Sequence, residues 1–413
     1  METIEFSGFK VAIDPETNFW AIYEEILPEE ILKFHEENRK ALTERMKKYR
    51  FDVDFNTAYI NPTERCNANC SYCYIPPEIR NRGREMDYET LRDILERLET
   101  LGVRNIIFHG AEPLIVKDKI FKAIDEFDYR FGIQTNGFLL ESHDVEFLVE
   151  RNVNVGLSFD SPRRETDDFL RGNGHHRKIV ELLDMFNGYA NLNIITTINR
   201  HNYTHLAEMV DFLAGKVRLV LMNPVRGTSE GGRSLRPDPL EAAEHFIDAV
   251  ERAIWHTKNG RRIVIGDFAN ILLGIIAPYS RVLQCDISPC GGGRRFISIT
   301  PGGIFPCGEF IGMEQFRTDL GNLENATNHF QEIRNRTVEN IEECRECTYR
   351  NICGAPCPAE VYAEAGTMLE KSPFCEFYKK IIEHAFRVIH RGDVEHVINL
   401  KGLRKIYEIE FEK

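Results

Sequence analysis

The pattern of apolar and polar positions repeats a short unit between residues 57 and 225. Short β-branched runs alternate with amphipathic stretches such as "YETLRDILERLETLG", in which apolar residues recur at helical spacing. This alternation predicts an α/β fold built from βα units around a parallel sheet. The expected strands are "NTAYINPT" (56–63), "VRNIIFHG" (103–110), "RFGIQTNG" (130–137), "NVGLSFDS" (154–161), "LNIITTIN" (192–199) and "VRLVLMNPV" (217–225).

The number of units limits the fold to two architectures. Six units are two fewer than a closed (β/α)8 barrel needs, so we expect either a partial (β/α)6, TIM-like barrel or a doubly wound sheet. Both folds place chemistry at the carboxyl ends of the strands, where this chain gathers polar groups, although turns alone also favour Asn, Gly and Asp there. These groups are "GAEP" (110–113), "QTNG" (134–137), Ser158, Asp160, Thr197, Asn199, Asn223 and Arg226.

The segments on either side follow other patterns. An N-terminal extension contains a β-like run, "FKVAI", and a charged helix that begins near Pro28. A helix is expected within 238–258, and after residue 285 the period is lost while Gly, Pro and Cys increase. The tail begins as a helix and ends in "YEIEFEK", a candidate strand. The expected divisions are 1–55, 56–258, 259–375 and 376–413.

Charge and hydropathy exclude several classes of protein. The net charge of −13 over 413 residues gives no global basic footprint for nucleic acid. No run of about 18 apolar residues is available to span a membrane. The first residues, "METIEFSGFK", lack the apolar core of a signal peptide. We therefore expect a cytoplasmic protein with no nucleic-acid or membrane partner.

The eleven cysteines point to metal or redox chemistry. In a reducing compartment this number does not indicate a disulfide framework. Three cysteines lie within 66–73, none within 74–284 and eight within 285–375. The spacing therefore predicts two cysteine-bearing regions separated by a scaffold without cysteine.

The first region is a loop directly after the first expected strand, with the spacing Cys66-x3-Cys70-x2-Cys73. A structural zinc site needs four ligands, and no fourth Cys or His lies nearby. A [4Fe–4S] cluster is normally bound by four thiolates. Bound by three, it exposes one iron to another ligand. We therefore expect an iron–sulfur cluster with one open coordination position.

With Tyr72 directly before its third cysteine, this loop resembles the signature of radical S-adenosylmethionine (SAM) enzymes. The resemblance covers roughly 57–225 and implies a partial (β/α)6 barrel. It implies that Cys66, Cys70 and Cys73 bind a catalytic cluster whose open iron chelates SAM. A low-potential donor, flavodoxin or ferredoxin, would supply the electron that releases a 5′-deoxyadenosyl radical.

The same resemblance suggests how SAM is bound. "GAEP" is similar to the family's "GGEP", with Ala111 in place of the second glycine, and Glu112 with its neighbouring backbone would receive the SAM ammonium. Arg171 would approach the SAM carboxylate or form a salt bridge, and Tyr72 would pack on adenine or in the core. The implied SAM-binding residues are Tyr72, Gly110, Ala111, Glu112, Asn136, Ser158, Asp160, Arg171 and Thr197.

The eight cysteines of the second region are enough for two sites with four ligands each, and each of these sites could also bind a structural zinc ion. The spacing in this region and the hairpin-like "CGGGRRFISITPGGIFPCGEF" resemble the SPASM domain of radical SAM enzymes, which carries two auxiliary [4Fe–4S] clusters. Spacing alone does not prove how the cysteines are paired. The resemblance implies one cluster on Cys285, Cys290, Cys307 and Cys357 and another on Cys344, Cys347, Cys353 and Cys375.

Enzymes with this pair of domains mostly modify peptides or proteins. The resemblance implies a radical SAM/SPASM peptide maturase that oxidatively joins side chains by a thioether or carbon–carbon bond, with residues 1–55 contributing to substrate capture. The alternative is an anaerobic sulfatase-maturating enzyme, but these carry an aspartate base directly after the cysteine equivalent to Cys307. Here Gly308 stands in that position and Glu309 follows, which disfavours this chemistry. A non-enzymatic iron–sulfur electron carrier would leave the three-cysteine loop unexplained.

Overall fold

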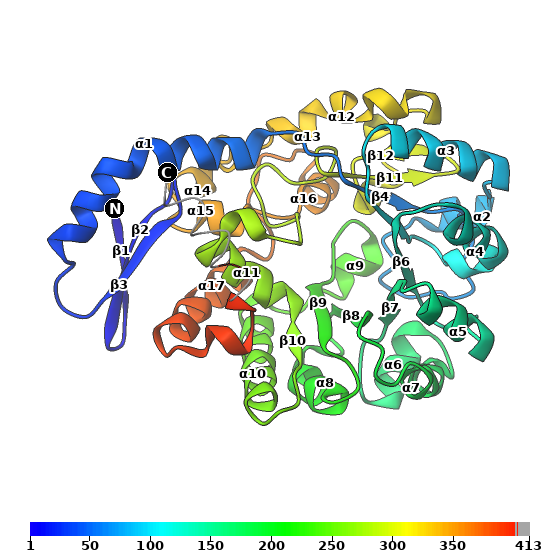
Figure 1. The fold of residues 1–413 in the computed structure, drawn as a ribbon, viewed down its shortest axis with the longest axis horizontal. Coiled ribbons are helices and arrows are strands. Elements are labelled where there is room, and N and C mark those ends of the chain that lie inside the picture. The colour runs from blue at the N-terminus through cyan, green and yellow to red at the C-terminus, as the bar shows by residue number, and fades with distance from the viewer. Residues whose placement is uncertain (401–402, 404–413) are drawn as a thin grey trace.

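The computed structural model describes residues 1–400 and residue 403, and its centre is an open sheet in the order β10-β9-β8-β7-β6-β5-β4-β11-β12 (Figure 1). From β4 to β9 every strand runs parallel to the next one along the chain. This single winding is that of a partial barrel, so the doubly wound alternative is wrong. All six expected strands are confirmed: β4 Thr57–Ile60, β5 Asn105–Phe108, β6 Arg130–Thr135, β7 Asn154–Ser158, β8 Leu192–Ile198 and β9 Leu219–Pro224.

Amphipathic helices cover the outer face of this sheet (Figure 1). In the helix 88–100, Leu91, Leu95 and Leu98 are fully buried, and the Asp87 carboxylate accepts a hydrogen bond of 2.7 Å from the Thr90 amide at its start. The helices along the barrel are α2 Pro77–Arg82, α3 Tyr88–Thr100, α4 Lys117–Glu126, α5 Ser142–Glu150, α6 Arg164–Arg171, α7 His175–Met185, α8 Leu206–Leu213, α9 Glu230–Ser234, α10 Pro239–Lys258 and α11 Gly266–Ile276.

Three strands of the sheet come from beyond residue 258. The predicted hairpin is present as β11 Phe296–Thr300 and β12 Gly303–Phe305, and its first strand pairs in parallel with β4. At the opposite edge, the short strand β10 Val264–Ile265 pairs with β9. The sequence did not predict that these strands extend the sheet. The cysteine-rich segment is thereby joined to the barrel through shared backbone hydrogen bonds.

The N-terminal extension forms its own antiparallel sheet, β1 Glu2–Phe6, β2 Phe9–Asp14 and β3 Phe19–Tyr23, followed by the long helix α1 Glu29–Phe51 (Figure 1). The sequence predicted β2 and a helix start at Pro28 but neither β1 nor β3. Asn351 donates 2.8 Å to the Pro15 carbonyl, and Arg50 forms a 2.7 Å ion pair with Glu339. The extension therefore packs on the cysteine-rich segment.

Short helices and loops make up most of the cysteine-rich segment, as the loss of periodicity predicted. Helix α17 Cys375–His390 begins at the last cysteine and continues into the tail, which was predicted to begin as a helix, and it packs on α10 and α11. The candidate strand "YEIEFEK" lies outside the described residues. Among those that are described, no helix has the length and apolar character needed to cross a membrane. The helices of this part are α12 Ala326–His329, α13 Gln331–Asn335, α14 Glu342–Arg345, α15 Arg350–Cys353, α16 Pro358–Ala365 and α17 Cys375–His390.

Candidate active site

The three-cysteine loop follows β4 and folds back on itself. The Cys73 amide donates 3.2 Å to the Cys70 carbonyl, and the Ala68 amide donates 3.4 Å to the Cys66 Sγ. Burial raises the pKa of Cys70 to about 11, and negative charge on Cys73 and Cys66 acts in the same direction. The three thiols therefore lie close enough to repel one another as thiolates. A bound metal cluster would relieve that repulsion, because it takes up thiolate charge.

Helix α9 supports the loop from one side. A methyl group on Gly231 would lie 1.9 Å from the Ser71 carbonyl oxygen, so the two backbones are in direct contact. Tyr72 is only 8% exposed and packs with Leu170 and Val225, while Cys70 lies against the same cluster. In this structure Tyr72 is a core aromatic residue, which is one of the two roles expected for it.

In the motif "GAEP", both oxygens of the Glu112 carboxylate are bound by the chain itself. Oε1 accepts hydrogen bonds from the Leu114 amide at 3.1 Å and the Thr135 hydroxyl at 2.7 Å, and Oε2 accepts from the Asn136 amide at 2.9 Å. Burial raises the pKa of Glu112 to about 7, against these hydrogen bonds, which lower it. The Glu112 amide also donates 3.1 Å to the Arg65 carbonyl. Glu112 thus ties the motif to the end of β6 and to the cysteine loop.

Asn136, at the end of β6, reaches the cysteine loop. Its Nδ2 donates 2.8 Å to Asn67 Oδ1 and lies 4.0 Å from Cys66 Sγ. Its Oδ1 accepts 3.0 Å from the Phe138 amide. The structure therefore brings together Asn136, the cysteine loop and "GAEP", which the sequence assigned to one rim.

Asp160 and Arg171 form a buried ion pair after β7. Arg171 Nε lies 2.8 Å from Asp160 Oδ2, and its Nη2 lies 3.1 Å from Oδ1. The Thr197 amide donates 2.9 Å to the same carboxylate, and the Tyr72 hydroxyl also donates to it. Arg171 therefore makes a salt bridge, as one of its two expected roles requires, but inside the protein. Ser158, half-buried at the end of β7, lies opposite Ile195 of β8.

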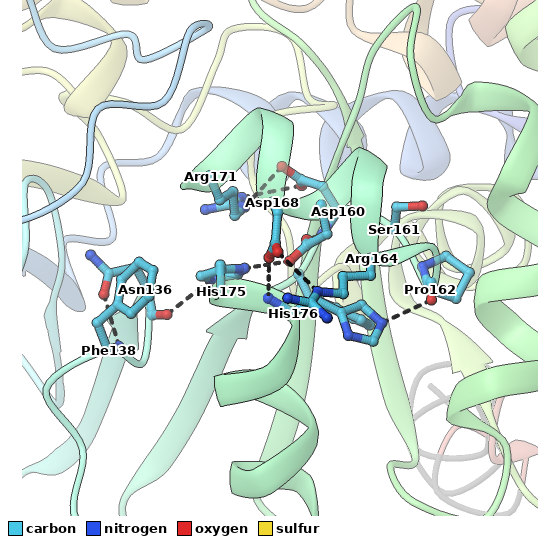
Figure 2. Close-up of polar contacts among 12 residues, drawn as sticks. Asn136, Phe138, Asp160, Ser161, Pro162, Arg164, Asp168, Arg171, His175 and His176 are labelled. Carbon is cyan, nitrogen blue, oxygen red and sulfur yellow. Dashed lines mark hydrogen bonds and ion pairs between the residues drawn. The ribbon is translucent and has the colours of Figure 1, made fainter. Parts of the chain in front are cut away.

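A second buried pair, His175 and Asp167, was not predicted. Both side chains are fully buried, and His175 Nδ1 lies 2.5 Å from Asp167 Oδ2. The His175 Nε2 lies 3.0 Å from the Asn136 carbonyl (Figure 2). Asp167 Oδ1 accepts 2.9 Å from the Asp160 amide. Both ring nitrogens therefore lie within hydrogen-bond distance of an oxygen, so the ring bridges the Asp167 carboxylate and the Asn136 carbonyl. The pair joins the ends of β6 and β7. In the sequence, "DDFLRGNGHH" reads as an exposed helix end and does not distinguish these residues.

The eight remaining cysteines form two groups of neighbours. Burial raises the pKa of Cys307, and charge on Cys357, Cys290 and Cys285 raises it further. Burial likewise raises the pKa of Cys353, with Cys375, Cys347 and Cys344 as its charged neighbours. The cluster ligand sets that the resemblance implied stay a prediction.

The first of these groups borders the same interior as the three-cysteine loop. A methyl group on Gly308 would lie 3.3 Å from the Tyr74 hydroxyl and 3.6 Å from the His109 ring. Tyr74 is half-buried, and its pKa is raised by desolvation and further by charge on Glu309, Cys73 and Cys307. Glu309 Oε2 accepts 3.0 Å from the Thr228 hydroxyl, and burial raises the pKa of Glu309 to about 7. Tyr74 thus lies between the two cysteine regions.

Comparison with known proteins agrees with this fold and site. A family model described as the radical SAM superfamily matches residues 60–213. An uncharacterized protein of Archaeoglobus fulgidus is 58% identical over 413 residues, 99% of each chain. A cysteine-type anaerobic sulfatase-maturating enzyme of Clostridium perfringens is 25% identical and covers 78% of this chain and 93% of its own. A PqqA peptide cyclase of Granulibacter bethesdensis is 26% identical, with 80% and 90% covered.

A solved structure described as "Native anSMEcpe with bound AdoMet and Cp18Cys peptide" has a TM-score of 0.68 at 19% identity and covers 82% of this chain and 98% of that chain. At this identity the match shows the shared fold. Fold and site together define an α/β enzyme with a thiol-lined loop at the carboxyl end of its first barrel strand. The chain belongs to the radical SAM superfamily, and its cofactors include SAM and a [4Fe–4S] cluster. The predicted family, fold class and enzymatic nature are confirmed.

Replacing His175 with leucine tests the buried pair. The substitution leaves the Asp167 carboxylate and the Asn136 carbonyl without their shared hydrogen-bond partner inside the protein. We expect the free energy of unfolding to fall by about 3–5 kcal/mol, measured by anaerobic denaturant titration. His329→Leu, at an exposed position, is the control and should change it by less than about 0.5 kcal/mol. A loss no larger than the control's would contradict the assigned pairing.

Proposed function

We propose that this protein is a radical SAM/SPASM peptide maturase, which carries three [4Fe–4S] clusters and oxidatively joins side chains of a peptide through a thioether or carbon–carbon bond. The observation that carries the proposal is the shared interior at Tyr74, which a three-thiol loop and a four-thiol group both border. An oxidation started by hydrogen abstraction leaves an electron to be removed. A redox centre beside the same interior is suited to accept it.

The residues of the rim fit the first cluster and SAM. Three thiols without a fourth protein ligand leave a coordination position for SAM, and Cys66, Cys70 and Cys73 would hold the cluster. Bound together there, cluster and SAM supply the 5′-deoxyadenosyl radical. Asn61 Oδ1 is a buried acceptor with no hydrogen-bond partner among the described residues, and it lies against Gly110 of "GAEP". An acceptor so placed suits the SAM ammonium.

The hydrogen bonds that each side chain makes within the protein indicate how it would take part in SAM binding. Because the chain binds both oxygens of Glu112, we assign that side chain to positioning and the ammonium to the backbone of Gly110 and Ala111. Arg171 holds Asp160 in place, and its positive charge lowers the pKa of Cys70, against the burial that raises it. The residues proposed to bind SAM, or in the case of Tyr72, Glu112 and Arg171 to position the residues that do, are Tyr72, Gly110, Ala111, Glu112, Asn136, Ser158, Asp160, Arg171 and Thr197.

The two four-cysteine groups are proposed to hold auxiliary clusters. Cys285, Cys290, Cys307 and Cys357 would bind one, and Cys344, Cys347, Cys353 and Cys375 the other. The charged neighbours of Cys307 and Cys353 support this interleaved pairing.

A peptide is the proposed substrate, and the relatives described as a peptide cyclase and as a peptide-bound enzyme support it. The sulfatase-maturating alternative has relatives of its own. Against it, Gly308 provides no carboxylate, and the Glu309 carboxylate already accepts a hydrogen bond from Thr228. We also propose that residues 1–55 help to capture the peptide and that flavodoxin or ferredoxin supplies the electron. The proposed domain divisions are 56–258 for the barrel, 259–375 for the linker and SPASM domain and 376–413 for the tail.

Substituting the loop cysteines separates the catalytic site from the auxiliary ones. We expect Cys66→Ala, Cys70→Ala and Cys73→Ala each to abolish formation of 5′-deoxyadenosine from SAM and dithionite, because each removes a ligand of the SAM-binding cluster. About eight iron per chain should remain. Product is measured by anaerobic chromatography. Retained cleavage in any of the three variants would refute the ligand assignment, and no cleavage by the iron-replete native chain would favour an electron carrier.

Metal analysis tests the number of clusters. We expect about 12 iron and no stoichiometric zinc per reconstituted chain, from three four-iron clusters. Elemental analysis by mass spectrometry together with the acid-labile sulfide content measures this directly. A ratio of about four iron to two zinc would mean that residues 285–375 hold structural zinc.

Mass spectrometry of the substrate tests the reaction. Small Cys-rich or repetitive peptides encoded beside this gene are incubated with enzyme, SAM and a reductant. We expect a loss of two hydrogens per modified site, because joining two side chains removes one hydrogen from each. A peptide containing a sulfatase motif is the control and should remain unmodified. Formylglycine in that control peptide would instead establish the sulfatase-maturating activity.

A further inference from the structure

Two arginines of the cysteine-rich segment are buried without a carboxylate partner. Arg294 is fully buried and Arg336 is 3% exposed. Among the described residues, neither guanidinium has a carboxylate oxygen within 4.0 Å. A buried cation is ordinarily paired with an anion, because removal from water is costly. Neither guanidinium therefore has a carboxylate of the described chain in contact with it, and for Arg294 the negative charge of Asp54 acts only from a longer distance.

Backbone carbonyls hold Arg336 in place. Its Nε donates 2.6 Å to Met368, its Nη1 donates 2.8 Å to Ala355, and its Nη2 donates 3.3 Å to Glu370, in each case to the carbonyl oxygen. Carbonyl groups satisfy the N–H donors but carry no net charge. The planar fork of an arginine suits such a three-way contact. The guanidinium position is thus well defined while its charge is not neutralised.

Arg336 lies between the two cysteine groups. Ala355, which accepts its Nη1, stands two residues from Cys353 of one group and two residues from Cys357 of the other. Burial lowers the pKa of Arg336, and the charges that oppose this shift are on Cys357, Cys290, Cys344 and Cys353. Its principal electrostatic partners are therefore thiols of both groups.

Arg294 lies beside the first group alone. Its Nη1 donates 3.0 Å to the Asp52 carbonyl, and its Nη2 donates 3.3 Å to the carbonyl of Pro289, the residue before Cys290. Its Nε has no partner among the described residues. Of the cysteines, only Cys290 is among its principal electrostatic partners. The two arginines thus differ in the number of cysteine groups that they face.

We propose that Arg294 and Arg336 are the buried counter-charges of the auxiliary clusters and raise their reduction potentials, Arg336 for both clusters and Arg294 for the one on the Cys290 group. The inference rests on the proposed function, because it takes those groups to be cluster ligands. A [4Fe–4S] cluster bound by four thiolates is anionic, and reduction adds one more negative charge. A fixed cation nearby stabilises the reduced form more than the oxidised form. Both clusters then accept a substrate electron more readily.

A purely structural role makes a different prediction. If Arg336 only joins loops through its three carbonyl contacts, lysine disrupts them about as much as glutamine does. If its charge is what matters, lysine preserves the potentials and glutamine does not. The comparison of Arg336→Lys with Arg336→Gln therefore separates the two roles, and Arg294→Gln provides an independent test at a second position.

The experiment is a redox titration of the reconstituted full-length chain, followed by electron paramagnetic resonance. We expect Arg336→Gln to decrease the equilibrium constant for reduction at least tenfold for both auxiliary couples, which is about 59 mV in midpoint potential for one electron. Arg294→Gln should shift one couple, and Arg336→Lys should shift neither. The couple of the SAM-binding cluster is the internal reference, and the exposed Arg177→Gln is the control.

Each outcome decides the matter. Less than a twofold change in both couples of Arg336→Gln, or an equal shift in Arg336→Lys, would overturn the proposal. If Arg336→Gln does not retain its iron, Arg294→Gln decides: a shift in one couple supports the proposal, and no shift overturns it. If the chain contains zinc and shows no auxiliary redox couples, the cluster assignment of the proposed function is wrong. Intact couples that do not respond to either arginine would leave that assignment standing.

Discussion

The parallel pairing of β11 with β4 is the contact on which the arrangement of the site depends. Strand β4 has β5 on one side and β11 on the other, so it is an internal strand of the sheet rather than its edge. The three-cysteine loop follows β4 directly, and Cys307 follows the hairpin that begins with β11. A shared backbone ladder therefore determines how the two cysteine regions lie relative to one another. Ile60 and Ile299, which pair across this ladder, are fully buried.

The site itself is built from buried charges that satisfy one another. Asp160 faces Arg171, Asp167 faces His175, and the Glu112 carboxylate accepts hydrogen bonds from three protein donors. Such networks contribute little net stability, but they are costly to leave half-satisfied, so they restrict the backbone to one arrangement. Here the arrangement keeps the ends of β6 and β7 together. A rim that binds a charged cofactor must keep its polar groups in fixed positions, and buried hydrogen bonds do this more specifically than additional apolar contacts would.

The sequence predicted those parts of the fold whose signals are local. Strands β4 to β9 were found from β-branched runs, α3 and α10 from helical periodicity, and the cysteine loop from its spacing. The pairing of β11 with β4 was not predicted, because residues 57–60 and 296–299 are far apart and nothing in either run specifies its partner. The His175–Asp167 pair was missed for a similar reason. A histidine in a polar helix shows its importance only when the carbonyl of a distant residue, Asn136, is found against it.

The same limit applies to the role given to Glu112. The resemblance implied that Glu112 and its neighbouring backbone receive the SAM ammonium, and the structure shows the Glu112 oxygens accepting hydrogen bonds from Leu114, Thr135 and Asn136. The motif located the residue in the chain, whereas these contacts could be found only in the structure. The direction of the Glu112 side chain depends on which groups the neighbouring strand β6 places beside it. This follows from the register of the two strands and not from the local sequence.

Packing bears on two positions that the resemblance singled out, Ala111 in "GAEP" and Gly308 after Cys307. In "GAEP", Gly110 has φ of +110° and a methyl group there would lie 2.0 Å from the Asn61 side chain, so this position requires glycine. Ala111 stands at the neighbouring position, which has no such restriction. At Gly308 a side chain would press against Tyr74 and His109. The Tyr74 and His109 rings, which stack on one another, therefore lie directly against this position, and the carboxylate of the next residue, Glu309, accepts a hydrogen bond from Thr228. A side chain at residue 308 could be accommodated only if these rings moved, which is a physical reason for glycine at this position.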